Sequence, residues 1–322
     1  MRVELRVFAT LIAILLPFIG FAQTPVQKPK PVYVSEDGEI YVKSGQDIYL
    51  RLAISPDDTA QSYILKSEAT EKGSKAEPFH FEGHGTHTIR HMADHRIPQK
   101  RKENHLFYVH DDGKPPRIKV SVTKAPWVYN GNVNIYGKPV TITLNTKDAD
   151  SGIFGTYASL NSKVFSEYQQ PIQLTQEMEY TLKFYAMDNV GNESKQRMRL
   201  YALDFTPPTT THKIIGGFVN VAGEDVVSPK SKISLDSRDA RAGVKDIRYR
   251  FKDKRAVYKK GSLLTMNGLK DGTHSLVYAA NDRVGNAEDN KTFTFYLDSI
   301  PPVVSYSLLG DRYIKGDTTF VS

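Results

Sequence analysis

The stretch that decides the fold is residues 179–192, EYTLKFYAMDNVGN. Apolar and polar side chains alternate along it, which is typical of a β-strand with one buried face. The Asp-x-Val-Gly-Asn at its end predicts a hairpin turn, because Asp starts an Asx turn and Gly and Asn tolerate positive φ. The strand pattern recurs in residues 272–286, GTHSLVYAANDRVGN, and in residues 85–94, GTHTIRHMAD, where the Gly-Asn turn is replaced by a basic segment. We therefore predict three copies of one β-unit.

Alternate positions within these stretches carry matching side chains, most of them apolar or aromatic. Such positions share one face of a strand, so we expect them to form the inward face of each unit. The matching residues are His87, Ile89, His91 and Ala93 in the first unit, Tyr180, Leu182, Phe184 and Ala186 in the second, and His274, Leu276, Tyr278 and Ala280 in the third.

Three Pro-Pro pairs, spaced 92 and 94 residues apart, punctuate the chain. Proline cannot donate to a β-ladder, and it restricts the residue before it to extended backbone. Each pair follows a strand pattern and has an Asp three residues before it, so it predicts the end of one module and a stiff joint to the next. The pairs begin at Pro115, Pro207 and Pro301, and the aspartates are Asp112, Asp204 and Asp298.

The composition predicts globular all-β modules. Hydrophobic residues make up 39% of the 322 residues and charged residues 25%, and Cys is absent. Without disulfides each module must bury its own core. About seven short strands per unit, with no amphipathic helix pattern, indicate tandem immunoglobulin-like β-sandwiches after an N-terminal signal peptide. The predicted segments are a signal peptide (1–22), a Pro/Lys tether (23–31), a divergent module (32–114), two further modules (115–206 and 207–300) and the start of an incomplete fourth (301–322).

The third unit carries a family resemblance. It has an Ala-Gly-Val loop at 242–244 before a Tyr-bearing strand, Asp-Gly-Thr-His at 271–274, and Asp-x-x-Gly-Asn at 282–286. These features resemble the tandem bacterial immunoglobulin-like repeats of secreted and envelope proteins, particularly the type named after leptospiral outer-membrane L proteins. The resemblance implies adhesion, spacing or accessory binding rather than one shared chemistry.

The N-terminus is typical of a signal peptide. Arg2 and Arg6 precede an almost wholly apolar run, and small residues before Gln23 suit cleavage there. The alternative is an uncleaved membrane anchor, which the short run and Pro17 disfavour. We expect an exported protein, in the periplasm, on the cell surface or outside the cell, with no transmembrane helix in the mature chain.

The formal net charge of +7 suits contact with anionic polysaccharide or lipid headgroups. Nucleic acid is not an expected partner, since no reader motif is present. The chain also lacks the signatures of common catalytic sites, with no Cys, no G-x-S-x-G and no H-E-x-x-H. We therefore expect no enzymatic activity.

Acidic loops indicate a candidate calcium site. In an immunoglobulin-type sandwich the B–C and F–G loops lie at one end, which brings Asp148 and Asp150 towards Asp188 and Asn189. Calcium takes about six to eight oxygen ligands, and these residues supply about half of them. The alternative is that they only form turns.

Seven of the 9 histidines fall between residues 80 and 110, which raises zinc as a second metal. His87, His91 and His95 are expected on one face of a strand, but at i, i+4 spacing their side chains are about 13 Å apart. A zinc site would therefore have to pair one of them with His84 or with a neighbouring strand, because zinc takes about three or four such ligands. The alternative is packing or surface histidine. We expect no resident cofactor, with calcium and zinc as the metals to test.

Trp127, Tyr129 and Tyr136 are candidate ligand-binding aromatics at the start of the second unit. Their alternative role is to cover the edge of the core. The leading function is a non-enzymatic secreted or cell-envelope protein acting as a modular stalk, adhesion or surface-binding array. It would reach a surface glycan or protein by direct binding or by strand addition. The alternative is a non-catalytic accessory region of a longer secreted glycan-degrading hydrolase.

Overall fold

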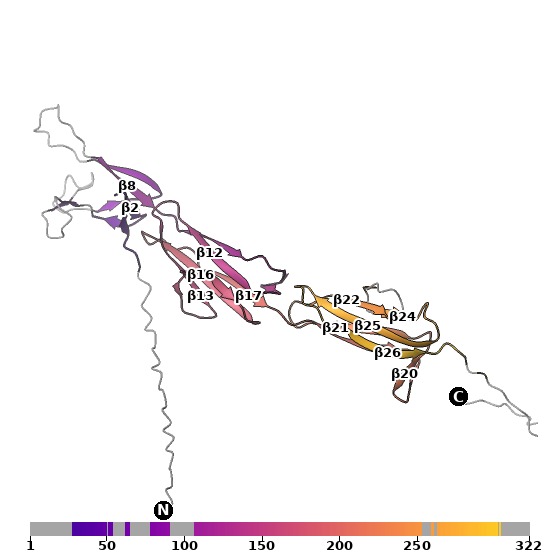
Figure 1. The fold of residues 1–322 in the computed structure, drawn as a ribbon. Helices are drawn as coiled ribbons and strands as arrows, with labels where there is room; N and C mark the ends of the chain where they lie inside the picture. Colours follow the sequence, from indigo (N-terminus) through magenta and orange to yellow (C-terminus); the bar gives the residue numbers. More distant parts are fainter. Residues whose placement is uncertain are drawn as a thin grey trace, which may run out of the picture.

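The computed structural model describes residues 28–49, 51–53, 62–64, 78–90, 106–252, 259–260, 263–301 and 303. Regular structure in these residues consists entirely of β-strands, which form three modules strung end to end (Figure 1). The predicted all-β architecture of tandem sandwiches is confirmed. The predicted signal peptide and almost all of the predicted fourth module lie outside the described residues. Within the described part of the chain, no helix is long and apolar enough to span a membrane.

The first module contains a four-stranded sheet in the order β1-β2-β8-β7 and two short strand pairs, β3 with β6 and β4 with β5. Its described core is small and consists of Val42, Ile48, Phe81 and Val109. The strands are β1 (Val32–Val34), β2 (Ile40–Lys43), β3 (Asp47–Ile48), β4 (Arg51–Ala53), β5 (Ser62–Ile64), β6 (Phe79–His80), β7 (Gly85–Arg90) and β8 (Leu106–Asp112).

The second module packs a six-stranded sheet, β10-β11-β17-β16-β13-β14, on a three-stranded sheet, β15-β12-β9. It has nine strands rather than about seven, and these include the edge hairpin β10–β11 and the two-residue β14. The strands are β9 (Arg117–Val122), β10 (Trp127–Asn130), β11 (Val133–Tyr136), β12 (Val140–Lys147), β13 (Ile153–Leu160), β14 (Ser166–Glu167), β15 (Ile172–Leu174), β16 (Glu179–Asp188) and β17 (Arg197–Leu203).

The third module repeats this plan with sheets β19-β20-β26-β25-β22-β23 and β18-β21-β24. Equivalent positions follow from the register, since Tyr136 lies opposite Leu203 as Val227 lies opposite Leu297. The strands are β18 (Thr209–Ile215), β19 (Phe218–Val221), β20 (Glu224–Val227), β21 (Lys232–Arg238), β22 (Val244–Phe251), β23 (Lys259–Lys260), β24 (Leu263–Thr265), β25 (Gly272–Asp282) and β26 (Lys291–Leu297).

The predicted inward faces of the second and third modules are confirmed. Leu182 and Phe184 on β16, like Leu276 on β25, have no exposed surface. The other predicted positions on these two strands are also buried: Tyr180, Ala186, His274, Tyr278 and Ala280. The alternation of apolar and polar residues therefore predicts the core-facing side of these strands correctly in both modules.

Glu288 ties the two sheets of the third module together. Its carboxylate accepts hydrogen bonds from the backbone N–H and hydroxyl of Thr210 on β18 and from the backbone N–H of Ala280 on β25. It also pairs with Lys291 at 2.8 Å. Burial acts to raise the pKa of Glu288, but these hydrogen bonds outweigh burial and hold the pKa below its ordinary value of 4.5. The equivalent residue of the second module is the uncharged Ser194.

We expect Glu288→Gln to destabilise the third module by about 2 kcal/mol near neutral pH, because hydrogen bonds to a charged group are lost. The folded pKa lies below the unfolded one, so the carboxylate stabilises above pH 4.5 and its contribution disappears as the pH falls through the folded pKa. Unfolding of parent and variant from about pH 3 to 7 measures both effects. The exposed Glu167→Gln is the control, and an unchanged acid dependence in Glu288→Gln would contradict the prediction.

Candidate cation sites at the module joints

The same hydrogen bond fixes both described joints. The Nδ2 of Asn192 donates to the backbone carbonyl of Asp112 at 2.9 Å, across the joint between the first and second modules. The Nδ2 of Asn286 donates to the carbonyl of Asp204 at 2.7 Å, across the joint between the second and third. The Gly-Asn turn and the aspartate before Pro-Pro are therefore two halves of one contact.

The aspartate that begins the Asp-x-Val-Gly-Asn turn holds its backbone in place. In the third module, Oδ1 of Asp282 accepts hydrogen bonds from the backbone N–H groups of Val284, Gly285 and Asn286, and Oδ2 accepts one from Asn286 Nδ2. Asp188 accepts from Val190 and Asn192 in the same way. The predicted Asx turn is confirmed. Gly285 has a φ of 102°, which explains the glycine at that position.

The aspartate before Pro-Pro also holds the acidic loop of the next module. The Oδ2 of Asp112 accepts a hydrogen bond from the backbone N–H of Ser151 at 3.2 Å. The Oδ2 of Asp204 accepts one from Ala242 at 2.8 Å. Each joint thus brings together the end of one module and two loops of the next.

Three carboxylates converge at each joint. In each group one oxygen per carboxylate lies within 4.8 Å of the others, and two of the three residues are buried. The first group contains one residue before the joint, one from the acidic loop of the second module and one from the end of β16. The second group repeats this arrangement with the end of β25. The groups are Asp112, Asp148 and Asp188, and Asp204, Asp239 and Asp282.

One carboxylate of each group has a raised pKa. Burial raises the pKa of Asp188, and the charges of Asp112 and Asp148 add to this, against hydrogen bonds from Asn192 that lower it. Burial likewise raises the pKa of Asp204, with a further contribution from Asp239 and Asp282. The ion pairs of the described residues include none between a Lys or Arg and these six aspartates. Such clusters have the charge and the oxygen ligands that suit a divalent cation.

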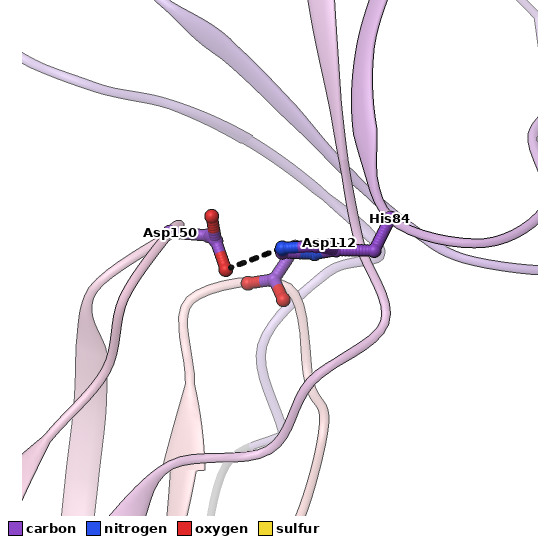
Figure 2. A group of neighbouring side chains, drawn as sticks. All are labelled: His84, Asp112 and Asp150. Carbon is purple, nitrogen blue, oxygen red and sulfur yellow. Dashed lines mark ion pairs between the residues drawn. The ribbon is translucent and has the colours of Figure 1, made fainter.

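The first joint has an additional histidine. His84, Asp112 and Asp150 form a further group with ligand atoms within 4.8 Å of one another, and Figure 2 shows the imidazole directed at the two carboxylates. His84 Nε2 lies 3.5 Å from Asp150 Oδ2. That oxygen is buried and accepts no hydrogen bond. The divergent first module therefore contributes a side chain to the joint.

The structure brings together most of the residues predicted for calcium. Asp148 and Asp188 meet in the first carboxylate group, and Asp150 lies beside His84. Asn189 instead donates its Nδ2 to the Ser151 carbonyl at 2.7 Å, so its amide nitrogen shapes the loop. The calcium prediction from the sequence does not include the aspartates before Pro-Pro or any residue of the second carboxylate group.

Two of the four histidines predicted for zinc, His84 and His87, lie in the described part of the chain. His84 lies at the joint, whereas His87 Nε2 is 3.8 Å from Asp111 Oδ2 and its ring lies 4.9 Å from that of Phe81. His91 and His95 lie outside the described residues. The two described histidines thus have different partners.

The three candidate aromatics occupy two environments. Trp127 and Tyr129 on the edge strand β10 are 56% and 58% exposed. Tyr136 on β11 is only 7% exposed and belongs to the core. The Trp127 and Tyr136 rings stack with centroids 6.3 Å apart, so an exposed aromatic surface continues into the sandwich.

No protein-family model matches the chain, and no curated protein matches it. Among solved structures, the fibronectin(III)-like modules of Clostridium thermocellum CbhA match with TM-score 0.29 and 14% identity, over 56% of this chain and 95% of that one. The D00-D0 domain of intimin matches with TM-score 0.24 and 11% identity, over 55% of this chain and 99% of that one. A tetra-tandem repeat in the extending region of a large adhesion protein matches with TM-score 0.28 and 13% identity, over 85% of this chain and 69% of that one. Because these TM-scores are low, the sandwich assignment rests on the strand order and register of this chain.

Proposed function

We propose that the chain is a non-enzymatic modular stalk of an exported protein, which spaces and presents a binding surface. The observation that carries this proposal is the repeated joint. In both described joints, an Asn side chain and an Asp carboxylate hydrogen-bond across the boundary between modules. Modules on a free linker have no need of the same contacts at each boundary, whereas a stalk of defined direction does.

Apolar packing at the second joint supports the same proposal. Ile135 and Ala202 of the second module form one buried cluster with Ala242 and Val284 of the third. Gly137 lies so close that a Cβ there would meet the backbone of Val284. Burial of Val284 at the tip of the turn gives the joint a hydrophobic contribution in addition to its hydrogen bonds.

Calcium is the cation that the joint chemistry favours. The donors are carboxylate oxygens, and Ca²⁺ prefers oxygen ligands from Asp, backbone carbonyls and water. Asp112, Asp148 and Asp188 would hold one ion, and Asp204, Asp239 and Asp282 another. A bound ion would neutralise the mutual repulsion of the carboxylates and join residues of two modules.

We expect the mature chain to scatter X-rays as an extended particle in both EDTA and calcium, with a stiffer profile in calcium. At calcium about a hundredfold above Kd, binding to the folded state is worth about 2.7 kcal/mol, so thermal unfolding should shift upwards. Asp239→Asn should reduce the shift, whereas Asp236→Asn, at an exposed position on β21, should not. A compact globule in both buffers would refute the stalk. Identical unfolding and scattering in both buffers would refute the calcium site alone.

A further inference from the structure

The second module has a groove of about 390 Å³ at one open side of its sandwich. Strands β9, β11 and β17 form its walls. The polar side chains that line it are Asn134, Tyr136, Arg197, Arg199 and Tyr201. Lys119 borders the groove through its backbone, because its side chain alternates with the inward-facing Ile118 and Val120 and lies on the outer face of β9.

Strand register places the exposed aromatics beside this groove. On the β10–β11 hairpin, Trp127 lies opposite Tyr136 and Tyr129 opposite Asn134. Cross-strand partners share one face of a sheet, and so do alternate residues of one strand. Asn134 in turn lies beside Tyr201 of β17. The exposed rings therefore continue the groove wall outwards along the same face of the sheet.

The groove is cationic. The side chains of Arg197 and Arg199 line it, and none of the described residues around it is acidic. Arg197 is anchored, because its Nη2 donates to the Ile118 carbonyl at 3.1 Å and its guanidinium lies 6.0 Å from the centre of the Phe184 ring. Arg199 is exposed, and its hydrogen bond to a described residue is the one from Nη1 to the carbonyl of the adjacent Met198, at 3.4 Å. Its remaining donors suit an incoming anion.

The groove also offers hydroxyl donors. Burial raises the pKa of Tyr201 to about 12, and the nearby Tyr136 adds to the shift while Arg199 opposes it. Burial raises the pKa of Tyr136 as well. Both phenols therefore keep their protons at neutral pH and can donate to a ligand oxygen.

The third module shows that the repeat does not require this groove. By register, Phe293 takes the place of Arg199, Val227 that of Tyr136, and Asp225 that of Asn134. His212 replaces Val120 and stacks on Phe293 with ring centroids 4.1 Å apart. Arg199, Tyr136 and Tyr201 thus have the uncharged and hydroxyl-free counterparts Phe293, Val227 and Phe295, whereas Arg197 corresponds to another cation, Lys291. Packing of the repeat therefore does not require Arg199 or the two phenols.

We propose that this groove binds an acidic polysaccharide, with a sugar carboxylate held by Arg199 and a sugar ring packed on Trp127 and Tyr129. Arginine suits a carboxylate because its planar fork can donate two parallel hydrogen bonds. Aromatic rings with a few polar groups are the usual lining of a ligand site. The inference deepens the proposed stalk function by naming its ligand, and it can fail without changing the scattering profile.

Trp127 is the only tryptophan of the chain, so its fluorescence reports directly on this site. We expect polygalacturonate to change the Trp127 emission of the mature chain with saturation, near physiological salt. Arg199→Ala should weaken binding about tenfold, in line with the loss of a charged hydrogen bond. Tyr129→Ala should weaken it about three- to tenfold through lost ring packing. The matched control is Arg238→Ala, which removes the same charge from a side chain of the third module that is 90% exposed.

Comparison ligands separate the contributions. Neutral dextran and polyglutamate should both bind at least tenfold more weakly than polygalacturonate. If Arg199→Ala and Arg238→Ala lose the same binding affinity for polygalacturonate, the net charge of the protein accounts for the effect, and the proposal is overturned. Equal binding of polyglutamate would overturn the sugar class, and equal binding of dextran would overturn the acidic one. If Arg199→Ala lowers the thermal stability, Asn134→Asp serves instead, because it adds the carboxylate found in the third module and should weaken binding to a similar extent.

Discussion

Replacement of Asp282 by alanine is expected to loosen the joint between the second and third modules and to destabilise the third by about 3–5 kcal/mol. Three backbone N–H groups and the Asn286 amide lose their acceptor at once. Asp282 has no exposed surface, so water cannot replace all of these hydrogen bonds without rearrangement of the turn. Once the turn rearranges, Asn286 no longer faces the Asp204 carbonyl.

Calorimetry measures the loss of stability, and small-angle scattering measures the loosened joint. Asp289→Ala is the matched control, since Asp289 is exposed and follows the same turn. Asn286→Ala should show the loosening with a smaller loss of stability, because the backbone hydrogen bonds of the turn remain. Indistinguishable behaviour of Asp282→Ala and Asp289→Ala would contradict this account of the joint.

Replacement of Phe184 by alanine is expected to destabilise the second module by about 3–5 kcal/mol. The ring is completely buried in the main cluster of that module, and truncation leaves a cavity that the rigid sheets cannot close. The third module has its own core cluster, so its unfolding should change much less. Calorimetry that resolves the two transitions tests this difference.

Met198→Ala is the control for Phe184→Ala, since Met198 is exposed on the neighbouring strand β17. It should change either transition by less than about 0.5 kcal/mol. Equal shifts of both transitions in Phe184→Ala would mean that the two modules unfold as one cooperative unit.

The β-sandwich fold can be predicted from the sequence, because the two patterns that indicate it, strand alternation and the turn motif, are local. Alternation along residues 179–188 identified the buried face, and the Asp-x-Val-Gly-Asn pattern identified the turn. The edge hairpin β10–β11 was missed, since its two strands have only four residues each and carry exposed aromatics on one side. Short strands with such side chains give no clear alternation.

The candidate sites depend on contacts that local patterns cannot show. Asp112 was identified only as a marker of the joint, because its burial and its approach to Asp148 arise from the docking of two modules. The groove depends on the parallel pairing of β11 with β17, which are separated by about sixty residues. The sequence repeat could have predicted the second carboxylate group, since Asp239 and Asp282 occupy the positions in the third module that Asp148 and Asp188 occupy in the second.

The parallel pairing of β11 with β17 has a mechanical consequence for a stalk under tension. One strand lies near the entry of the chain into the module and the other at its exit, so a pull on both ends slides them past each other. The bonds between them are then loaded in shear and share the force, which is a resistant arrangement because they must break together. The second module pairs four residues in this way and the third pairs two. A rising load should therefore open the third module first and leave the second, with its groove, intact and in place.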